Sequence, residues 1–335
     1  MRLIENTYGS DEHGLIWGYR FLSGESAAPI GTSEIPGFLA DDAERGFLWL
    51  HFSLSNLASE RFLQRSLQLP EAFFESLHSD IASTRLEQDG VALIAVIHDV
   101  LFESAFEASD VGTTSLYVGP RLLVSARLRP LRSVEQLRAA VRSGRSFRSP
   151  VELLSHLLQD QAAVLGDILR KSTTKVDSIE DQLLAHGRST DRKQLGALRR
   201  TLVRLQRLLA PEPTALFRLL NRPPEWISTH DVEDLRQAAE EFSTAIGDSG
   251  ALVERIKLIQ EELVALVNEQ TGRILFLLTV VTVLALPINL VAGLFGMNVG
   301  GLPLSSDTHG FALIVGCLVG LTSLLAYFAF GRRRD

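Results

Sequence analysis

The sequence is poor in cysteine and has no excess of basic residues. Cys317 is the single cysteine among 335 residues, which excludes an intramolecular disulfide framework and a zinc site built from cysteines. Lys and Arg number 33 against 40 Asp and Glu, which gives a net charge of −7. A nucleic-acid-binding protein normally carries a basic surface, so we expect no nucleic-acid partner.

Targeting and catalytic motifs are also missing. The first 14 residues are polar and charged, so no secretory leader is expected. The sequence has no glycine-rich phosphate loop, nucleophile elbow or other catalytic constellation, which argues against an enzyme with a bound cofactor. Its eight histidines include no pair at the spacing of two metal ligands on one helix, so no tight structural zinc site is expected.

Two long apolar runs lie near the end of the sequence. Residues 274–295 form 22 uncharged positions, and residues 311–330 form a further 20. A helix of 22 residues is about 33 Å long, enough to cross a hydrocarbon core of about 30 Å. The sequence therefore predicts two transmembrane helices in contact with a lipid bilayer, joined by a loop at 296–310.

Basic residues flank both apolar runs and are absent from the loop between them. They are Arg255, Lys257 and Arg273 before the first run and Arg332, Arg333 and Arg334 after the second. Because loops rich in Lys and Arg stay in the cytoplasm, we expect both termini to be cytoplasmic and the loop to face outward. Residues 1–273 then lie inside the cell, and residues 331–335 form a basic cytoplasmic tail.

Residues 1–150 alternate between apolar runs of strand length and segments with helical spacing. The predicted strands are Phe47–Leu54, Val91–Ile97, Thr114–Val118 and Arg121–Ser125, and the predicted helices are Leu57–Leu69 and Pro70–His78. Gly119 and Pro120 form a plausible turn between the last two strands, which predicts that these strands pair. This part of the chain is therefore expected to form one α+β cytoplasmic domain, with strands and helices mixed along the sequence.

Residues 151–227 have a helical pattern and are expected to form antiparallel cytoplasmic helices. Leucine recurs at three- and four-residue steps in Val151–Leu184 and in Arg192–Leu209, and Pro211 ends the second helix. The second helix also carries a stripe of basic residues. They are Arg199, Arg200, Arg204 and Arg207. A solvated helix face explains this stripe better than an anion-binding site.

From residue 228 one helix is predicted to run as a stalk over 228–273 and then as the first membrane span. Such a helix of about 65 residues would be roughly 100 Å long. Small and apolar residues recur at strict three- and four-residue spacing from Leu235 to Leu266, a pattern typical of a coiled-coil seam. We therefore expect partner helices along the seam and self-association of the chain.

The first span carries its polar side chains on one narrow face, at about 100° per residue. These are Thr279, Thr282 and Asn289, and the same arc holds Leu275, Leu286 and Gly293. An amide in hydrocarbon needs a hydrogen-bond partner or water, so this face predicts either helix–helix hydrogen bonds or the wall of a pore. Two helices cannot enclose a pore, so a pore requires several copies. Gly316 and Gly320 would then pack the second span against its neighbour.

The first span ends in Gly296-Met297-Asn298, followed by Val299-Gly300-Gly301-Leu302-Pro303. Gly-Met-Asn at this place, in a chain with two C-terminal spans, resembles the CorA superfamily of divalent cation transporters over nearly the whole chain. Members of the magnesium branch tend to have an aromatic and acidic residues soon after the motif. The residues found here, and Phe295 before the motif, instead resemble the ZntB branch of zinc transporters.

The resemblance implies a homopentamer in the bacterial inner membrane, with a funnel-shaped cytoplasmic domain and a ring of Asn298 at the outer pore mouth. Neutral amide oxygens suit a hydrated cation, because they bind its water shell without removing it. Gly296 would let the backbone leave the helix, and Met297 would serve packing. The transported ion is expected to be Zn²⁺, with Mg²⁺ or Co²⁺ as the alternative, and a proton gradient is a candidate driving force.

Two further side chains in the outer loop have metal-binding chemistry, Asp307 and His309. A transient contact with the passing ion is one interpretation, and an ordinary exposed histidine is the other. A rival from another class is a two-span coiled-coil sensor or scaffold. That rival predicts no ion flux and tolerance of the change Asn298→Ala.

Overall fold

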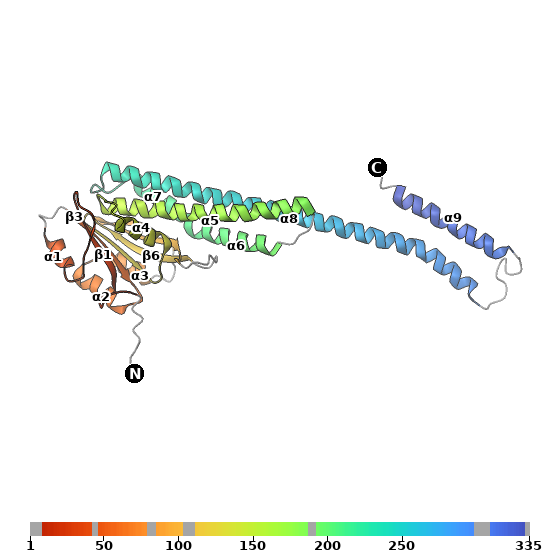
Figure 1. The fold of residues 1–335 in the computed structure, drawn as a ribbon, viewed down its shortest axis with the longest axis horizontal. Coiled ribbons are helices and arrows are strands. Elements are labelled where there is room, and N and C mark those ends of the chain that lie inside the picture. Colours follow the sequence, from red (N-terminus) through yellow and green to blue (C-terminus); the bar gives the residue numbers. More distant parts are fainter. Residues whose placement is uncertain are drawn as a thin grey trace, which may run out of the picture. The chain divides into compact units, whose positions relative to one another are not determined.

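The computed structural model describes residues 9–41, 46–78, 85–102, 111–186, 192–297 and 309–331. The chain divides into two compact units, Met1–Ile259 and Gln260–Asp335. The first unit contains an α/β domain and long helices, and the second contains the end of helix α8 and helix α9 (Figure 1). The expected fold class, an α/β domain followed by long helices and two apolar helices, is confirmed.

The α/β domain is built on a mixed sheet. Its described strands are β1 (Leu15–Leu22), β2 (Ala28–Pro29), β3 (Gly46–Ser53), β4 (Arg85–Asp89), β5 (Ala92–Val100), β6 (Val111–Val118) and β7 (Leu122–Arg127). They lie in the order β2-β1-β3-β7-β6-β5-β4. Neighbouring strands are antiparallel except β3 and β7, which run parallel. The predicted pairing across Gly119 and Pro120 is confirmed, because β6 and β7 pair there.

Both faces of the sheet are covered by helices. One face packs on α4 (Arg132–Arg142), α5 (Pro150–His186), α7 (Pro211–Leu220) and the start of α8 (Thr229–Phe295), and the other on α1 (Ile35–Ala40), α2 (Leu57–Ser66) and α3 (Glu71–His78). Successive side chains of a strand point to opposite faces. In β3, Phe47 and Trp49 therefore join the first core and Leu48 and Leu50 the second. Burial on both faces also explains the nearly continuous apolar sequence of β5.

A buried polar network lies between β1, β3, β7 and α4. Nε2 of His51 accepts a hydrogen bond from Arg127 Nε at 2.8 Å, and Nδ1 lies 2.7 Å from Ser125 Oγ. Since arginine can only donate, Nδ1 must carry the imidazole proton. The His51 ring stacks on Trp17 at 4.1 Å, and Arg138 lies over the Trp17 ring at 4.2 Å. Burial, followed by the charges of Arg127 and Arg138, lowers the pKa of His51 well below 6.5, so the ring is neutral near pH 7.

The first part of α8 lies beside α5, where Arg255 contacts Asp177, and beside α6 (Arg192–Leu209), where Gly250 lies close to Gln206 (Figure 1). The helices predicted at 151–184 and 192–209 are therefore confirmed. Helix α6 ends at Leu209 as expected, and Pro211 begins the unpredicted α7. Proline suits the first turn of a helix because its missing N–H would have no partner there.

The seam of α8 is buried within the single chain as far as Leu263. Leu235, Phe242 and Ile256 are fully buried, and Ile259 is 4% exposed. Leu235 joins the core of the α/β domain, and α5 and α6 run beside the residues that follow it. The expected partner helices along this part of the seam are therefore supplied by the chain itself, so the three–four repeat indicates burial and does not by itself indicate self-association.

Candidate ion pathway

Among the described residues, two helices are long and apolar enough to span a membrane: the C-terminal part of α8 and α9 (Gly310–Gly331). Helix α8 is continuous over 67 residues, which confirms the predicted long helix. In the most apolar 18-residue stretch of α8, only 6% of the residues are buried in the single chain, and in that of α9 the share is 0%. Surfaces this apolar need a cover, so lipid or further protein must surround both segments.

The predicted pore-lining residues share one exposed face of α8. They are Thr279, Thr282, Leu286, Asn289 and Gly293. On the opposite face, roughly 150° away at 100° per residue, Val280 is buried and its helical neighbours are only partly exposed. These neighbours are Phe276, Leu284, Pro287 and Val291. The polar line thus lies within the broad exposed part of α8, roughly opposite its most covered residues.

The polar side chains on this face differ in whether their hydrogen bonds are already satisfied within α8. Thr279 Oγ1 donates to the carbonyl of Leu275 at 2.8 Å, and Thr282 Oγ1 donates to that of Leu278 at 2.8 Å. A hydroxyl bonded in this way is satisfied by its own helix. Asn289 has two amide hydrogens and a carbonyl oxygen to satisfy, so it has the largest demand for water or a polar partner.

The end of α8 marks the start of the Gly-Met-Asn motif. Gly296 N–H donates to the Ala292 carbonyl at 2.9 Å, and Met297 N–H donates to that of Leu294 at 3.4 Å. Gly296 leaves the helix without a positive φ. No left-handed backbone conformation therefore requires glycine at this position.

Two predicted site residues, Asn298 and Asp307, lie outside the described residues. His309 is exposed just before α9, and its carbonyl accepts a hydrogen bond from Leu313 N–H at 3.2 Å. Within the described ranges, no three His, Cys, Asp or Glu side chains lie close enough to hold a metal ion. The described part of the candidate site is therefore the polar line on α8 and the turn that follows it.

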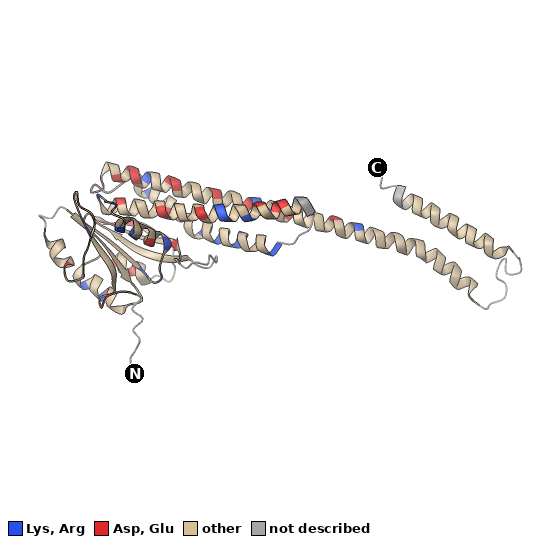
Figure 2. Cartoon of the chain, in the orientation of Figure 1, with Lys and Arg blue, Asp and Glu red and all other residues tan. Residues whose placement is uncertain are grey.

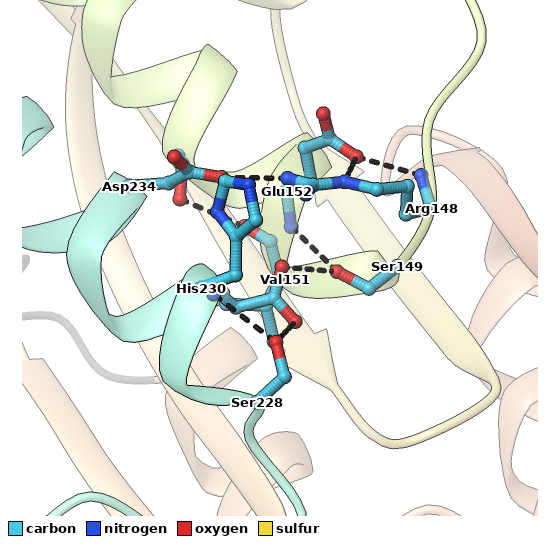
Figure 3. Close-up of polar contacts among 9 residues, drawn as sticks. Arg148, Ser149, Val151, Glu152, Ser228, His230 and Asp234 are labelled. Carbon is cyan, nitrogen blue, oxygen red and sulfur yellow. Dashed lines mark hydrogen bonds and ion pairs between the residues drawn. The ribbon is translucent and has the colours of Figure 1, made fainter.

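A polar clasp joins the beginnings of α5 and α8 (Figure 3). It consists of Arg148, Ser149, Glu152, Ser228, Asp231 and Asp234. Arg148 reaches Asp234 at 2.7 Å and Glu152 at 3.0 Å, and Ser149 Oγ lies 2.9 Å from Asp231 Oδ1. Carboxylates at helix N-termini interact favourably with the helix dipole. The clasp therefore fixes the start of α8 to the α/β domain, and it was not predicted from the sequence.

A second contact joins α8 to α5 further along the helix. The guanidinium of Arg255 lies 2.7 Å from Asp177 and 2.5 Å from Glu180. Hydrogen bonds to Glu180 and then Asp177 raise the pKa of Arg255, so the side chain stays charged. In the sequence, Arg255 is one of the basic residues that precede the first span. In the fold, the carboxylates of Asp177 and Glu180 balance its charge.

A pair of buried acids was also missed. Glu212, in the first turn of α7, accepts the His98 backbone N–H at 2.6 Å, and Gln161 Nε2 lies 3.5 Å from its other oxygen. Burial raises the pKa of Glu212 well above 4.5, which favours the neutral acid. Asp99 accepts from Ser133 at 2.8 Å, and burial raises its pKa to about 6. These groups lie where β5 meets α4, α5 and α7, and no spacing in the sequence indicates them.

A folded α/β domain, a helix that continues into an apolar span and a polar line on that span define an integral membrane protein of the transporter or channel class. Comparison with known proteins identifies the family. The family described as "CorA-like Mg2+ transporter protein" matches residues 44–333, which is most of the chain. The chain therefore belongs to the CorA-like family of divalent cation transporters, and the resemblance inferred from the Gly-Met-Asn motif is confirmed.

Individual relatives agree with this assignment. The divalent cation transporter CmaX of Pseudomonas aeruginosa is 28% identical over 329 residues, 97% of each chain. The zinc transport protein ZntB of Yersinia enterocolitica is 23% identical and covers 84% of this chain and 85% of its own. The solved structure of full-length CmaX superimposes with a TM-score of 0.81 at 25% identity, covering 97% of this chain and 99% of that one. The likeness therefore includes both the α/β domain and the two apolar helices.

Proposed function

We propose that the chain forms a homopentameric pore in the bacterial inner membrane through which divalent cations cross. The observation that carries this proposal is the uncovered polar line on α8, which includes Thr279, Thr282 and Asn289. In a ring of copies the first spans would form the inner wall and α9 the outer one. Water in the pore would then hydrogen-bond the amide of Asn289. No charged residue in either span would be needed to satisfy that amide.

The outer mouth would be formed by the Gly296-Met297-Asn298 motif. Five Asn298 amide oxygens would bind the water shell of a cation, and the C-terminal end of α8 would add partial negative charge. Met297 would support the mouth by packing. Asp307 and His309 would make a transient contact with the arriving ion, since an ion held tightly leaves slowly.

Zn²⁺ is the proposed cargo, because Val299 to Pro303 resemble the zinc branch of the family and ZntB is among the relatives. Mg²⁺ or Co²⁺ is the second candidate, and the description of the family as a whole names Mg²⁺. The two cargoes differ in ligand preference: Mg²⁺ demands oxygen ligands and retains its waters, whereas Zn²⁺ also accepts His309. No ATP-binding motif is visible in the sequence, so an ion gradient, such as that of protons, would drive transport.

In this arrangement the α/β domain of residues 1–150, the helices of 151–227 and the stalk of 228–273 lie in the cytoplasm. The spans are 274–295 and 311–330, with the loop 296–310 outside and the tail 331–335 inside. The positive flanks of the spans support this orientation. The likeness to CmaX and ZntB over most of the chain supports the membrane location and not the orientation.

Ion flux into proteoliposomes tests the proposal. Zn²⁺ and Mg²⁺ are supplied separately to the purified chain, with and without a pH gradient, beside Asn298→Ala and the control Asn268→Ala, whose side chain is exposed on α8 before the span. Zinc flux that is lost in Asn298→Ala and retained in Asn268→Ala supports the pore and its cargo. Magnesium flux without zinc flux changes the cargo, and no flux of either from a folded oligomer contradicts transport.

A further inference from the structure

Helix α6 has a basic face that the single chain leaves without an acidic partner helix. Its 18 residues include no Asp or Glu. At about 100° per residue, four exposed cations fall within an arc of roughly 60°. They are Lys193, Arg200, Arg204 and Arg207. This arc lies opposite the buried residues Leu195, Leu202, Leu205 and Leu209, and it extends over about 21 Å of helix.

The first part of α8 has an acidic face of similar length. Four exposed carboxylates fall within an arc of roughly 100° and extend over about 22 Å. They are Glu233, Glu240, Glu241 and Asp248. This arc lies roughly 150° from the buried side of the same turns, which includes Leu235, Ala238 and Phe242. Figure 2 shows acidic residues along this part of α8 and basic residues along α6.

The two charged faces cannot meet within one chain. Helices α6 and α8 approach each other at Gln206 and Gly250, where a Cβ on Gly250 would lie 3.1 Å from Gln206 Nε2. Each charged face is turned away from the apolar side by which its helix packs. Within the described part of the chain, no ion pair involves any of the eight charged residues named above.

We propose that the basic face of α6 in one copy binds the acidic face of α8 in the next copy. A closed ring of identical subunits requires two different, complementary surfaces on every subunit. The spacing is compatible, because the cations of α6 lie 7, 11 and 14 positions after Lys193 and the acids of α8 lie 7, 8 and 15 positions after Glu233. This inference rests on the proposed homo-oligomer and adds to it which helices recognise each other.

Charge reversal in the full-length protein tests the interface. The variants are Arg200→Glu with Arg204→Glu on α6, Glu233→Lys with Glu240→Lys on α8, and all four changes together. Arg61→Glu with Arg65→Glu, two exposed residues on α2 at the four-residue spacing of the α6 pair, form the matched control. The oligomeric mass of each protein in detergent is measured at low and high salt, and circular dichroism checks that each variant is folded.

Each two-residue reversal should raise the subunit dissociation constant by about tenfold or more at low salt, because like charges then face each other. The four-residue variant should restore assembly, and the control should not change it. Higher salt should weaken the wild-type oligomer, because exposed charge pairs are screened. A wild-type oligomer that none of these changes affects overturns the interface and leaves the proposed transporter intact, whereas a wild-type monomer removes both.

Cross-linking provides a second test of the contact between α6 and α8 of neighbouring subunits that does not depend on charge reversal. In a Cys317→Ser background, Arg204→Cys and Glu240→Cys are made as separate single-cysteine proteins and mixed. A short bis-maleimide should link the two kinds of subunit to each other, and neither protein alone should form the same product. If the α6 reversal instead abolishes binding to vesicles that contain anionic lipid and leaves the oligomer unchanged, the basic face serves the membrane and the proposal is overturned.

Discussion

The guanidinium of Arg148, in the residues that lead into α5, lies 2.7 Å from the carboxylate of Asp234 in the first turns of α8. The same guanidinium bonds Glu152 at 3.0 Å. One side chain therefore ties two long helices together at their N-termini, where Asp231 and Ser228 complete the clasp (Figure 3). Because α8 continues unbroken into the apolar span, any rotation of α8 at its start requires this clasp to rearrange.

The change Arg148→Gln should loosen the first turns of α8 with little loss of global stability. Arg148 is 50% exposed, so its ion pairs contribute about 1 kcal/mol or less to folding. Hydrogen exchange of the amides that begin α8 should nevertheless become faster. Arg170→Gln is the matched control, because that arginine contacts Asp167 within one helix, and no ion pair among the described residues joins it to a second helix. Equal exchange in both variants would mean that the clasp does not hold α8.

The buried acids predict a pH dependence of stability opposite to that of an ordinary surface carboxylate. Burial raises the pKa of Asp99 from 3.8 to about 6 and raises that of Glu212 above 4.5. The folded state then binds more protons than the unfolded state, so stability falls as the pH rises through these values. For Asp99, the loss in the free energy of unfolding is absent below about pH 4 and complete above about pH 6. This loss amounts to roughly 3 kcal/mol.

The change Glu212→Gln should flatten this profile. A neutral amide keeps the acceptor for His98 N–H, and the Gln161 oxygen, which has no partner among the described atoms, lies nearby to receive its N–H. The thermal midpoint of the full-length protein should fall less between about pH 5 and about pH 8 than in the wild type. The exposed Glu225→Gln should leave the slope unchanged. A wild-type slope preserved in Glu212→Gln would show that this carboxyl is already ionised in the fold.

The sequence predicted the membrane spans and most strands, but it missed contacts between distant residues. An uncharged run of 22 residues has few interpretations, and β-branched runs such as that of β5 mark buried strands. Strand β1 was missed because Gly18 and Arg20 interrupt its pattern. Gly18 is needed there because a Cβ would come within 2.7 Å of the Ile30 carbonyl. The clasp was missed because Arg148 and Asp234 are 86 positions apart.

The seam of α8 illustrates a different limit. Periodic burial of Leu235, Phe242 and Ile256 was predicted correctly, but the partner was not. A heptad pattern depends on which side of a helix avoids water and is the same whether another copy or the same chain covers that side. The polar line on the first span has the same ambiguity in reverse: it is visible in the sequence, but the sequence does not show whether water or other copies of the chain would meet it. Asn298 and Asp307 are outside the described residues and stay predictions.

The polar network under α4 makes His51 a determinant of stability. The change His51→Leu removes the acceptor for Arg127 Nε and the donor to Ser125 Oγ, and the buried guanidinium keeps its ion pair with Glu135 but loses this hydrogen bond. We expect a loss of about 2–4 kcal/mol in the free energy of unfolding, measured by denaturant titration. His230→Ala, at a histidine whose side chain is 66% exposed, should cost less than about 0.5 kcal/mol. Similar losses in both variants would contradict the role assigned to the network.

On the proposed pore face, Asn289 and Thr279 should respond differently to loss of their polar groups. Thr279→Val removes a hydroxyl that already bonds the Leu275 carbonyl, so cation flux should change less than about threefold. Asn289→Leu removes the group with the largest demand for water and should lower flux about tenfold or more, as a narrow pore becomes apolar there. Both are measured in proteoliposomes at matched amounts of folded oligomer.

Thr322→Val on α9 is the control for both changes, because its hydroxyl bonds the Leu318 carbonyl in the same way on the span assigned to the outer ring. It should leave flux unchanged. If Asn289→Leu also retains full flux while the oligomer stays intact, the amide serves helix packing and the pore lies on another face of α8. If Asn289→Leu instead dissociates the oligomer, the amide bonds neighbouring copies, and the polar line is an interface rather than a wall facing water.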